Sequence, residues 1–350
     1  MKTHWTVRLG KSISFLIDKK AFKVSLVLAA LLLIAFFIST GAGEVMMNPL
    51  EVIQTLTGFG SEMNRLIISS FRMPRILIAI LVGVCLAVAG GILQGIIRNP
   101  LASPDIIGIT GGASFAVVTF LALFSDKNNA LTVSIQWMPA AAFAGAVTVG
   151  FIVYALSWKG GSSSFRLVLV GIGFSMLAQS MTTMMMIKGP IYRASQANTW
   201  ITGTVYGATW EQVKIMFPIT AVLLIITVVA IRIINLQGLG DELGTGAGSA
   251  VQRNRMLLLL LSTALTGVSV AFAGGIGFVG LMAPHIARRL VGSSYGAMLP
   301  VSALAGAILV LIADLIGRTV FSPLEVPAGV FTAAIGAPYF IYLLYKTRNT

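Results

Sequence analysis

Residues 83–92 read GVCLAVAGGI, and residues 267–276 read GVSVAFAGGI. Seven of these ten positions are identical at an offset of 184 residues, and the same offset places Pro100 on Pro284. Both copies lie in long apolar segments. A repeat shared by two halves of an apolar chain is typical of membrane transporters, although helices rich in glycine and alanine also resemble one another by chance.

The composition of the chain indicates that lipid is its main solvent. Of its 350 residues, 57% are hydrophobic and 10% are charged, and the mean hydropathy is +0.92. A soluble protein could not cover that much apolar surface with polar groups, so a bilayer must surround most of the chain. One cysteine, Cys85, and two distant histidines, His4 and His285, argue against a metal site, and we expect no bound cofactor.

Ten apolar stretches predict membrane spans, and we expect residues 1–350 to form one all-α integral membrane domain. The predicted spans are 24–40, 71–96, 106–124, 137–157, 165–187, 215–235, 256–274, 276–290, 298–318 and 328–345. The stretch 276–290 is too short for a full crossing and contains Pro284, so we expect a short broken span or a re-entrant segment there.

The positive charge of the chain is concentrated where it can orient the protein in a membrane. The net charge is +13, and residues 1–23 form a basic tail before the first apolar stretch. This pattern indicates a cytoplasmic tail beside anionic lipid and excludes a nucleic-acid groove. A cleaved signal peptide over residues 1–43 is the alternative, but the long apolar stretch favours an uncleaved span.

The number of spans then fixes the expected direction of the repeat. With ten spans, both termini and 16 of the 24 basic residues face the cytoplasm, and 8 face outward. The first copy of the repeat then lies in the second span and the other in the seventh span. Five crossings separate them, so we expect two inverted-topology halves, spans 1–5 and 6–10.

The sequence offers no energy source of its own. Gly10-Lys11-Ser12 resembles the end of a phosphate loop, but Trp5 stands where that motif needs glycine, so we expect no ATP site, no catalytic residues and no enzyme activity. Asp314 is the best candidate for ion coupling, yet Arg318 lies one helical turn later and favours a structural ion pair. Energy is expected from a separate subunit. An ion-coupled secondary transporter is the alternative.

Eight motifs in order resemble one family of permeases. They are Arg72-Met-Pro-Arg75, the run from Gly90 through Arg98-Asn-Pro-Leu101, Pro104-Asp-Ile-Ile-Gly108, Gly277-Phe-Val-Gly-Leu281, Pro284-His-Ile-Ala-Arg288, Ala313-Asp314, Glu325-Val-Pro-Ala-Gly329 and Gly336-Ala-Pro338. The chain resembles the FecCD-type permease subunits of ABC importers for iron–siderophore complexes, haem and cobalamin. The resemblance implies the vitamin B12-type permease fold in a bacterial cytoplasmic membrane. It also implies inward transport of an iron(III)–siderophore complex, with haem or cobalamin as alternative cargoes.

The resemblance also implies partners. They are a cytoplasmic ABC ATPase dimer, a second permease that is identical or homologous, and an external binding protein or lipoprotein. Membrane lipid surrounds the assembly, and no nucleic acid is expected. ATP binding and hydrolysis would alternate the access of a central pathway between the two permeases.

Three arginines are implied to dock the binding protein on the outer side: Arg72, Arg75 and Arg318. Arginine suits this role because it is permanently charged and can grip a carboxylate with two hydrogen bonds. The alternatives are snorkelling at the membrane interface and, for Arg318, pairing with Asp314.

A loop over residues 238–255 resembles the segment that transmits movement from the ATPase. The residues that match the family there are Gly240, Asp241, Glu242 and Gly248. Gly244 and Gly246 replace better helix formers, so we expect a short helix or one that is ordered only by its partner. A flexible inner loop is the alternative.

Two further segments match inner-gate positions of the family. The residues are Asn99 and Leu101 after the second span, and Ser164 and Phe165 before the fifth. Polar and small groups at a constriction can close a pathway without binding cargo tightly. The alternatives are structural, because Ser164 could cap the fifth span and Asn99-Pro100 could form a turn.

Overall fold

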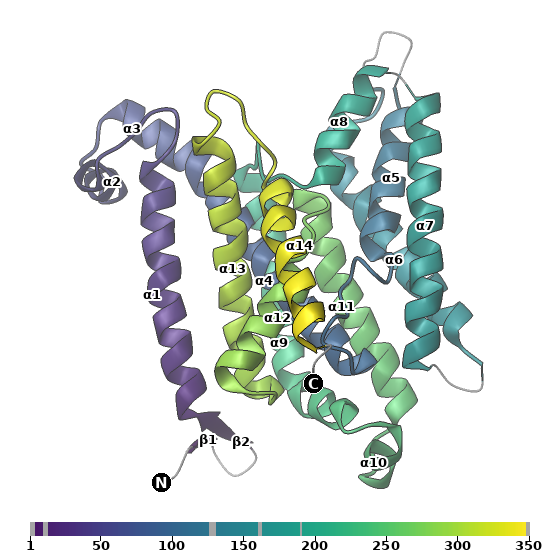
Figure 1. The fold of residues 1–350 in the computed structure, drawn as a ribbon. Coiled ribbons are helices and arrows are strands. Elements are labelled where there is room, and N and C mark those ends of the chain that lie inside the picture. The colour runs from purple at the N-terminus through teal and green to yellow at the C-terminus, as the bar shows by residue number, and fades with distance from the viewer. Residues whose placement is uncertain (1–3, 10–12, 126–130, 160–162, 190, 348–350) are drawn as a thin grey trace.

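The computed structural model describes residues 4–9, 13–125, 131–159, 163–189 and 191–347, and the chain folds into a bundle of helices (Figure 1). Ten of these helices overlap the ten predicted spans. They are α1 (Lys19–Gly41), α4 (Met73–Ile97), α5 (Ile109–Leu123), α6 (Met138–Ser157), α7 (Ser164–Lys188), α9 (Trp210–Gly238), α11 (Val251–Ala273), α12 (Val279–Val291), α13 (Tyr295–Thr319) and α14 (Ala328–Thr347).

The helices differ in how well they suit a full membrane crossing. Within the described residues, seven helical segments are long and apolar enough to span a bilayer, whereas α5 and α14 are shorter apolar helices. The helix α12 has 13 residues, or about 20 Å at the usual rise of 1.5 Å per residue, against a hydrocarbon core of about 30 Å. It follows a non-helical stretch over residues 274–278, so the structure places a short helix in the segment 276–290, and its role as a broken span or a re-entrant segment stays a prediction.

The N-terminal segment adds a two-stranded hairpin to the predicted all-helical domain. Two strands, β1 (His4–Leu9) and β2 (Ile13–Asp18), pair antiparallel where the sequence predicted only a basic tail over residues 1–23. The helix α1 then begins at Lys19, because Asp18 caps it by accepting hydrogen bonds from the backbone N–H groups of Lys20 and Ala21 at 2.7 and 3.0 Å. The last residues of the predicted tail are therefore the first turn of a helix.

The remaining elements lie at the two ends of the bundle. The upper end in Figure 1 carries α2 (Pro49–Leu56), α3 (Glu62–Leu66) and α8 (Ile191–Thr202). The segment η1 (Ile67–Arg72) joins α3 to α4, and a short turn η2 (Ile135–Trp137) leads into α6. The lower end carries the two strands and α10 (Asp241–Gly246). We call these two ends the upper end and the lower end.

The helix α4 is the centre of the bundle, since most of its side chains are buried and it packs on α9, α11, α12 and α13. The hydroxyl of Ser262 on α11 donates to the carbonyl of Ala89 on α4 at 3.0 Å. Ser269, seven residues later on α11, donates to the carbonyl of Val82 at 3.5 Å. Val82 lies seven residues before Ala89 on α4. The helices that carry the two copies of the repeat therefore run antiparallel.

Glycines let the backbones around α4 approach closely. A Cβ atom built on Gly83 would lie 2.3 Å from the carbonyl oxygen of Gly306 on α13, and one on Gly90 would lie 1.8 Å from that of Gly280 on α12. Both distances are far inside van der Waals contact. Small residues at such crossings allow membrane helices to gain packing energy that lipid cannot supply.

This packing predicts that Gly90→Ala destabilises the bundle. The added methyl group would collide with backbone and force α12 away from α4, and overpacking of this kind costs about 1–3 kcal/mol or more. The matched control is Gly173→Ala on α7, where a Cβ atom would meet no other atom within 4 Å and helix propensity favours alanine by about 1 kcal/mol. Thermal unfolding of both variants in detergent micelles measures the difference, and equal unfolding temperatures would contradict it.

Candidate functional site

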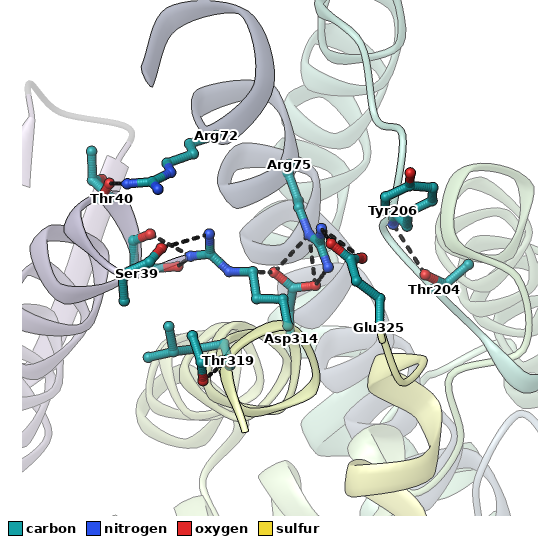
Figure 2. Close-up of polar contacts among 12 residues, drawn as sticks. Ser39, Thr40, Arg72, Arg75, Thr204, Tyr206, Asp314, Thr319 and Glu325 are labelled. Atoms are coloured by element: carbon teal, nitrogen blue, oxygen red, sulfur yellow. Dashed lines mark hydrogen bonds and ion pairs between the residues drawn. The ribbon is translucent and has the colours of Figure 1, made fainter. Parts of the chain in front are cut away.

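An arginine cluster occupies the upper end of the bundle (Figure 2). It comprises Arg72, Arg75 and Arg318 with the carboxylates of Asp314 and Glu325. Arg72 ends η1 and Arg75 lies in the first turn of α4, three positions apart and therefore on neighbouring faces. The last turns of α13 run antiparallel beside them and supply Asp314 and Arg318. The three arginines predicted to act together thus lie together.

Arg75 binds two carboxylates at once. Its Nε and Nη2 atoms donate to Asp314 at 2.8–3.1 Å, and its Nη1 atom donates to both oxygens of Glu325 at 3.0 and 2.9 Å. The Asp314 side chain is 1% exposed, whereas that of Glu325 is 35% exposed. The guanidinium also lies 5.6 Å from the ring centroid of Tyr206. Arg75 therefore joins a buried carboxylate to one at the protein surface.

Arg72 and Arg318 hold the C-terminal end of α1. Arg72 donates from Nη1 to the carbonyls of Thr40 and Gly41 at 2.6 and 3.1 Å. Arg318 donates to the carbonyl of Ala42 at 3.0 Å and to both oxygens of Ser39. The last carbonyls of a helix have no partner within it and carry partial negative charge, so cations from η1 and α13 satisfy them.

Both of these arginines are buried, each with 6% of its surface exposed. Arg318 also lies near Asp314, with 3.7 Å between Nε and Oδ2, which is the pairing that the sequence left open. The guanidinium groups of Arg72 and Arg318 are therefore engaged by the chain itself. Their role in docking a partner stays a prediction.

The predicted coupling residues lie on and around α10 at the lower end. Gly240 precedes the helix with a φ of 106°, Asp241 and Glu242 form its first turn, and Gly248 follows it with a φ of 79°. These positive φ values favour glycine at both positions. Glu242 is exposed. The helix is only six residues long, which agrees with the short helix expected from its glycines.

Asp241 has two partners that the sequence did not identify. Its Oδ1 atom accepts from Arg255 at 2.7 Å and pairs with Arg98 at 3.1 Å. Arg255 belongs to α11, which begins at Val251, so the predicted loop 238–255 ends earlier than expected. The excess of basic over acidic residues, 24 against 11, was the available signal that one carboxylate could meet two arginines.

The predicted gate residues lie close together at the lower end. Asn99 Oδ1 accepts from the Leu101 N–H at 2.9 Å, which forms the turn that the sequence allowed. Ser164 donates to the carbonyl of Ile96 at 3.0 Å and so ties the start of α7 to the end of α4. Phe165 is 76% exposed.

The N-cap of α7 differs from the one that the sequence allowed. Ser163, not Ser164, occupies the N-cap position and accepts from the N–H of Arg166 at 3.5 Å. Ser164 is the first helical residue, which frees its hydroxyl for α4. The capping alternative for Ser164 was therefore wrong by one residue, while its role as a gate stays a prediction.

A cavity of about 360 Å³ adjoins this turn, between the lower ends of α4, α9 and α12 and the start of α13. Arg98, Asn99, Arg288 and Tyr295 are among the residues that line it. Arg288 donates to Gln94 at 3.1 Å and lies 6.0 Å from the ring centroid of Tyr295. The lower end therefore presents a polar, basic hollow beside the candidate gate.

Comparison with known proteins identifies relatives over nearly the whole chain. Residues 31–346 match the FecCD transport family. The chain is 65% identical over 333 residues to the Bacillus subtilis protein named "Probable siderophore transport system permease protein YfhA", covering 95% of this chain and 97% of that protein. It is 45% identical to the achromobactin transport system permease protein CbrC of Dickeya dadantii, covering 92% and 91%.

A solved structure has the same fold. It is described as the inward-facing conformation of an ABC transporter assigned to the metal-chelate type. Its TM-score to this chain is 0.80 at 29% sequence identity, and the match covers 93% of this chain and 99% of that one.

The arginine cluster predicts unequal costs for removing its two carboxylates. Asp314→Asn should lower the free energy of unfolding by about 3–5 kcal/mol, because it leaves buried arginines without their counter-ion. Glu325→Gln removes the partly exposed partner of the same Arg75 and should cost about 0–1 kcal/mol. Thermal or denaturant unfolding in detergent compares the two variants, and equal losses would contradict this account of the cluster.

Proposed function

Because the chain belongs to the FecCD transport family, we propose that it is the permease subunit of an ABC importer that moves an iron(III)–siderophore complex into a bacterial cell. The observation that carries the cargo class is the 65% identity over 333 residues to a permease named for siderophore transport. The solved relative of metal-chelate type supports the same class. The permease is not an enzyme, and ATP hydrolysis belongs to a separate subunit.

The position of Asp314 weighs against the ion-coupled alternative. A proton- or ion-coupled transporter needs an ionisable group that can change its charge state near the membrane centre. The carboxylate of Asp314 lies in the upper part of α13 and accepts three hydrogen bonds from Arg75. A carboxylate held by a fixed counter-ion in this way suits a structural role.

The charge distribution supports a cytoplasmic lower end, ten crossings and two inverted halves. The basic residues of the lower end include Lys19, Lys20, Lys23, Arg98, Lys159, Arg166, Arg253, Arg255, Arg288, Arg289 and Lys346. An excess of Lys and Arg marks cytoplasmic segments. The short helices α5, α12 and α14 then count as crossings completed by their neighbouring segments, and the antiparallel α4 and α11 supply the direction expected of an inverted repeat.

The two ends of the bundle would meet different partners. At the cytoplasmic end, α10 and its flanking residues would couple the permease to the ATPase dimer, and the coupling residues are Gly240, Asp241, Glu242 and Gly248. The turn at Asn99 and Leu101, together with Ser164 and Phe165, would close the pathway. A second permease, identical or homologous, would complete that pathway, and a binding protein or lipoprotein would deliver the cargo outside.

At the outer end, Arg75 is the best placed of the three arginines for direct docking. Its Nη1 atom faces Glu325, a surface carboxylate that a carboxylate of the binding protein could replace. Val320, Phe321 and Leu324 in the same loop are 51–75% exposed and offer apolar contact beside the charge. Arg72 and Arg318 would support this surface by holding α1 next to it.

The function is tested by reconstituting the permease with its ATPase and binding protein in liposomes. We expect uptake of the radioactive ferric siderophore that requires ATP and the binding protein and persists when an ionophore collapses ion gradients. A Walker-lysine variant of the ATPase is the control. Uptake that an ionophore abolishes and that needs no ATP would contradict the proposal.

The docking role predicts that Glu325→Gln tightens association with the binding protein. Removal of the internal carboxylate frees Arg75 for its partner, and a surface ion pair of this kind corresponds to about two- to fivefold in affinity. Surface plasmon resonance on the permease in nanodiscs measures the change. Glu44→Gln, an exposed glutamate at the same end, is the control for charge alone. Equal effects of the two variants would overturn the assignment.

A further inference from the structure

We propose that Asp241 transmits movement within the permease and does not contact the ATPase, because it ties α10 to the lower ends of α4 and α11. This inference rests on the proposed coupling role of α10. The pairs of Asp241 with Arg98 and Arg255 are called the Asp241 link below. The ATPase would act on the outer face of α10, and the Asp241 link would carry the displacement to the two helices.

Ion pairs within the chain distinguish Asp241 from its exposed neighbours on α10. Asp241 is the first helical residue, and one of its oxygens pairs with both arginines, at 2.7 Å to Arg255 and 3.1 Å to Arg98. Glu242 and Leu243 are exposed on the same turn, and Leu243 is 65% exposed. An exposed apolar residue beside a charged one suits a protein contact, whereas the carboxylate of Asp241, although 42% exposed, already has two arginine partners within the permease.

In the Asp241 link, the pair with Arg255 involves a fully buried side chain. Arg255 is the largest fully buried side chain among the described residues, with 1% of its surface exposed. It lies in the second turn of α11, whose later turns carry the second copy of the repeat. Burial fixes the guanidinium in one place, so movement of Asp241 must either move α11 or break the pair.

In the Asp241 link, the pair with Arg98 lies next to the candidate gate, because Asn99 follows Arg98 in the chain. Arg98 ends α4 in the left-handed conformation, with a φ of 56°, which is uncommon for a residue other than glycine. The turn formed by Asn99 and Leu101 follows at once. Gly240 passes so close that a Cβ atom there would lie 3.0 Å from Arg98 Nη1. Asp241 thus holds the residue that sets the direction of the gate turn.

A side-chain hydrogen bond joins the two ends of the segment that carries α10. The side chain of Gln237, which is 3% exposed, donates to the carbonyl of Val251 at 2.8 Å. This bond closes the α9–α10–α11 connection on itself. Of the ion pairs in the described residues, the one between Asp241 and Arg98 joins this closed loop to α4.

The experiment measures coupling separately from assembly. The complete transporter is reconstituted with Asp241→Asn, with Asp241→Glu, and with Arg98→Asn, in which asparagine tolerates the left-handed conformation. Glu242→Gln is the matched control on the outer side. Three quantities are measured: the ATPase that co-purifies, the rate of ATP hydrolysis, and the siderophore imported per ATP hydrolysed.

We expect Asp241→Asn and Arg98→Asn to retain the ATPase and its hydrolysis but to lower the siderophore imported per ATP by at least about fivefold, the lower end of the range for energetic coupling between two sites. Asp241→Glu should restore most of that ratio. Glu242→Gln should weaken ATPase binding and leave the ratio unchanged. A purely structural role would instead lower folded yield in every Asp241 variant.

Two results would overturn the Asp241 link. The first is a wild-type import ratio in both Asp241→Asn and Arg98→Asn. The second is loss of the ATPase from Asp241→Asn, which would make Asp241 a direct contact. Failure of the wild-type transporter to recruit an ATPase would instead contradict the proposed function as well as the link, so the two failures are distinguishable.

Discussion

The carboxylate of Asp314 holds the upper ends of three helices in place. It is buried, it accepts from Arg75 at the start of α4, and it lies beside Arg318 on its own helix. Arg318 and Arg72 then bind the carbonyls that end α1. A buried charge in a membrane protein is costly unless it is paired, so separation of these groups would destabilise the fold.

Ion pairs hold both ends of the central helix α4, and close backbone packing holds its middle. Arg75 joins it to α13 above, and Arg98 joins it to α10 below. Between them, Gly83 and Gly90 bring its backbone against α13 and α12 with no room for a methyl group. A helix fixed in this way links the upper end of the bundle to the lower end.

The sequence predicted the helices well because lipid imposes a length and a polarity that can be read locally. It also predicted the short segment that became α12. The strands β1 and β2 were missed because their basic residues were interpreted only as a membrane-orienting charge. The arginines were identified from the family resemblance, and of their partners only Asp314 was predicted, as the partner of Arg318. Arg75 and Glu325 are 250 residues apart, and no periodicity indicates which cation such a carboxylate meets.

The attachment of α1 has a consequence for how the protein responds to its membrane. This helix packs mainly on α13, and only 6% of its apolar stretch is buried inside the protein. Its 23 residues span about 34 Å, slightly more than a typical hydrocarbon core. Because Arg72 and Arg318 bind its upper end and lysines lie at its lower end, a bilayer thinner than this helix is matched by tilting of the helix about Ser39–Ala42. The adjustment to membrane thickness is then confined to a helix at the edge of the bundle, away from the central helix α4.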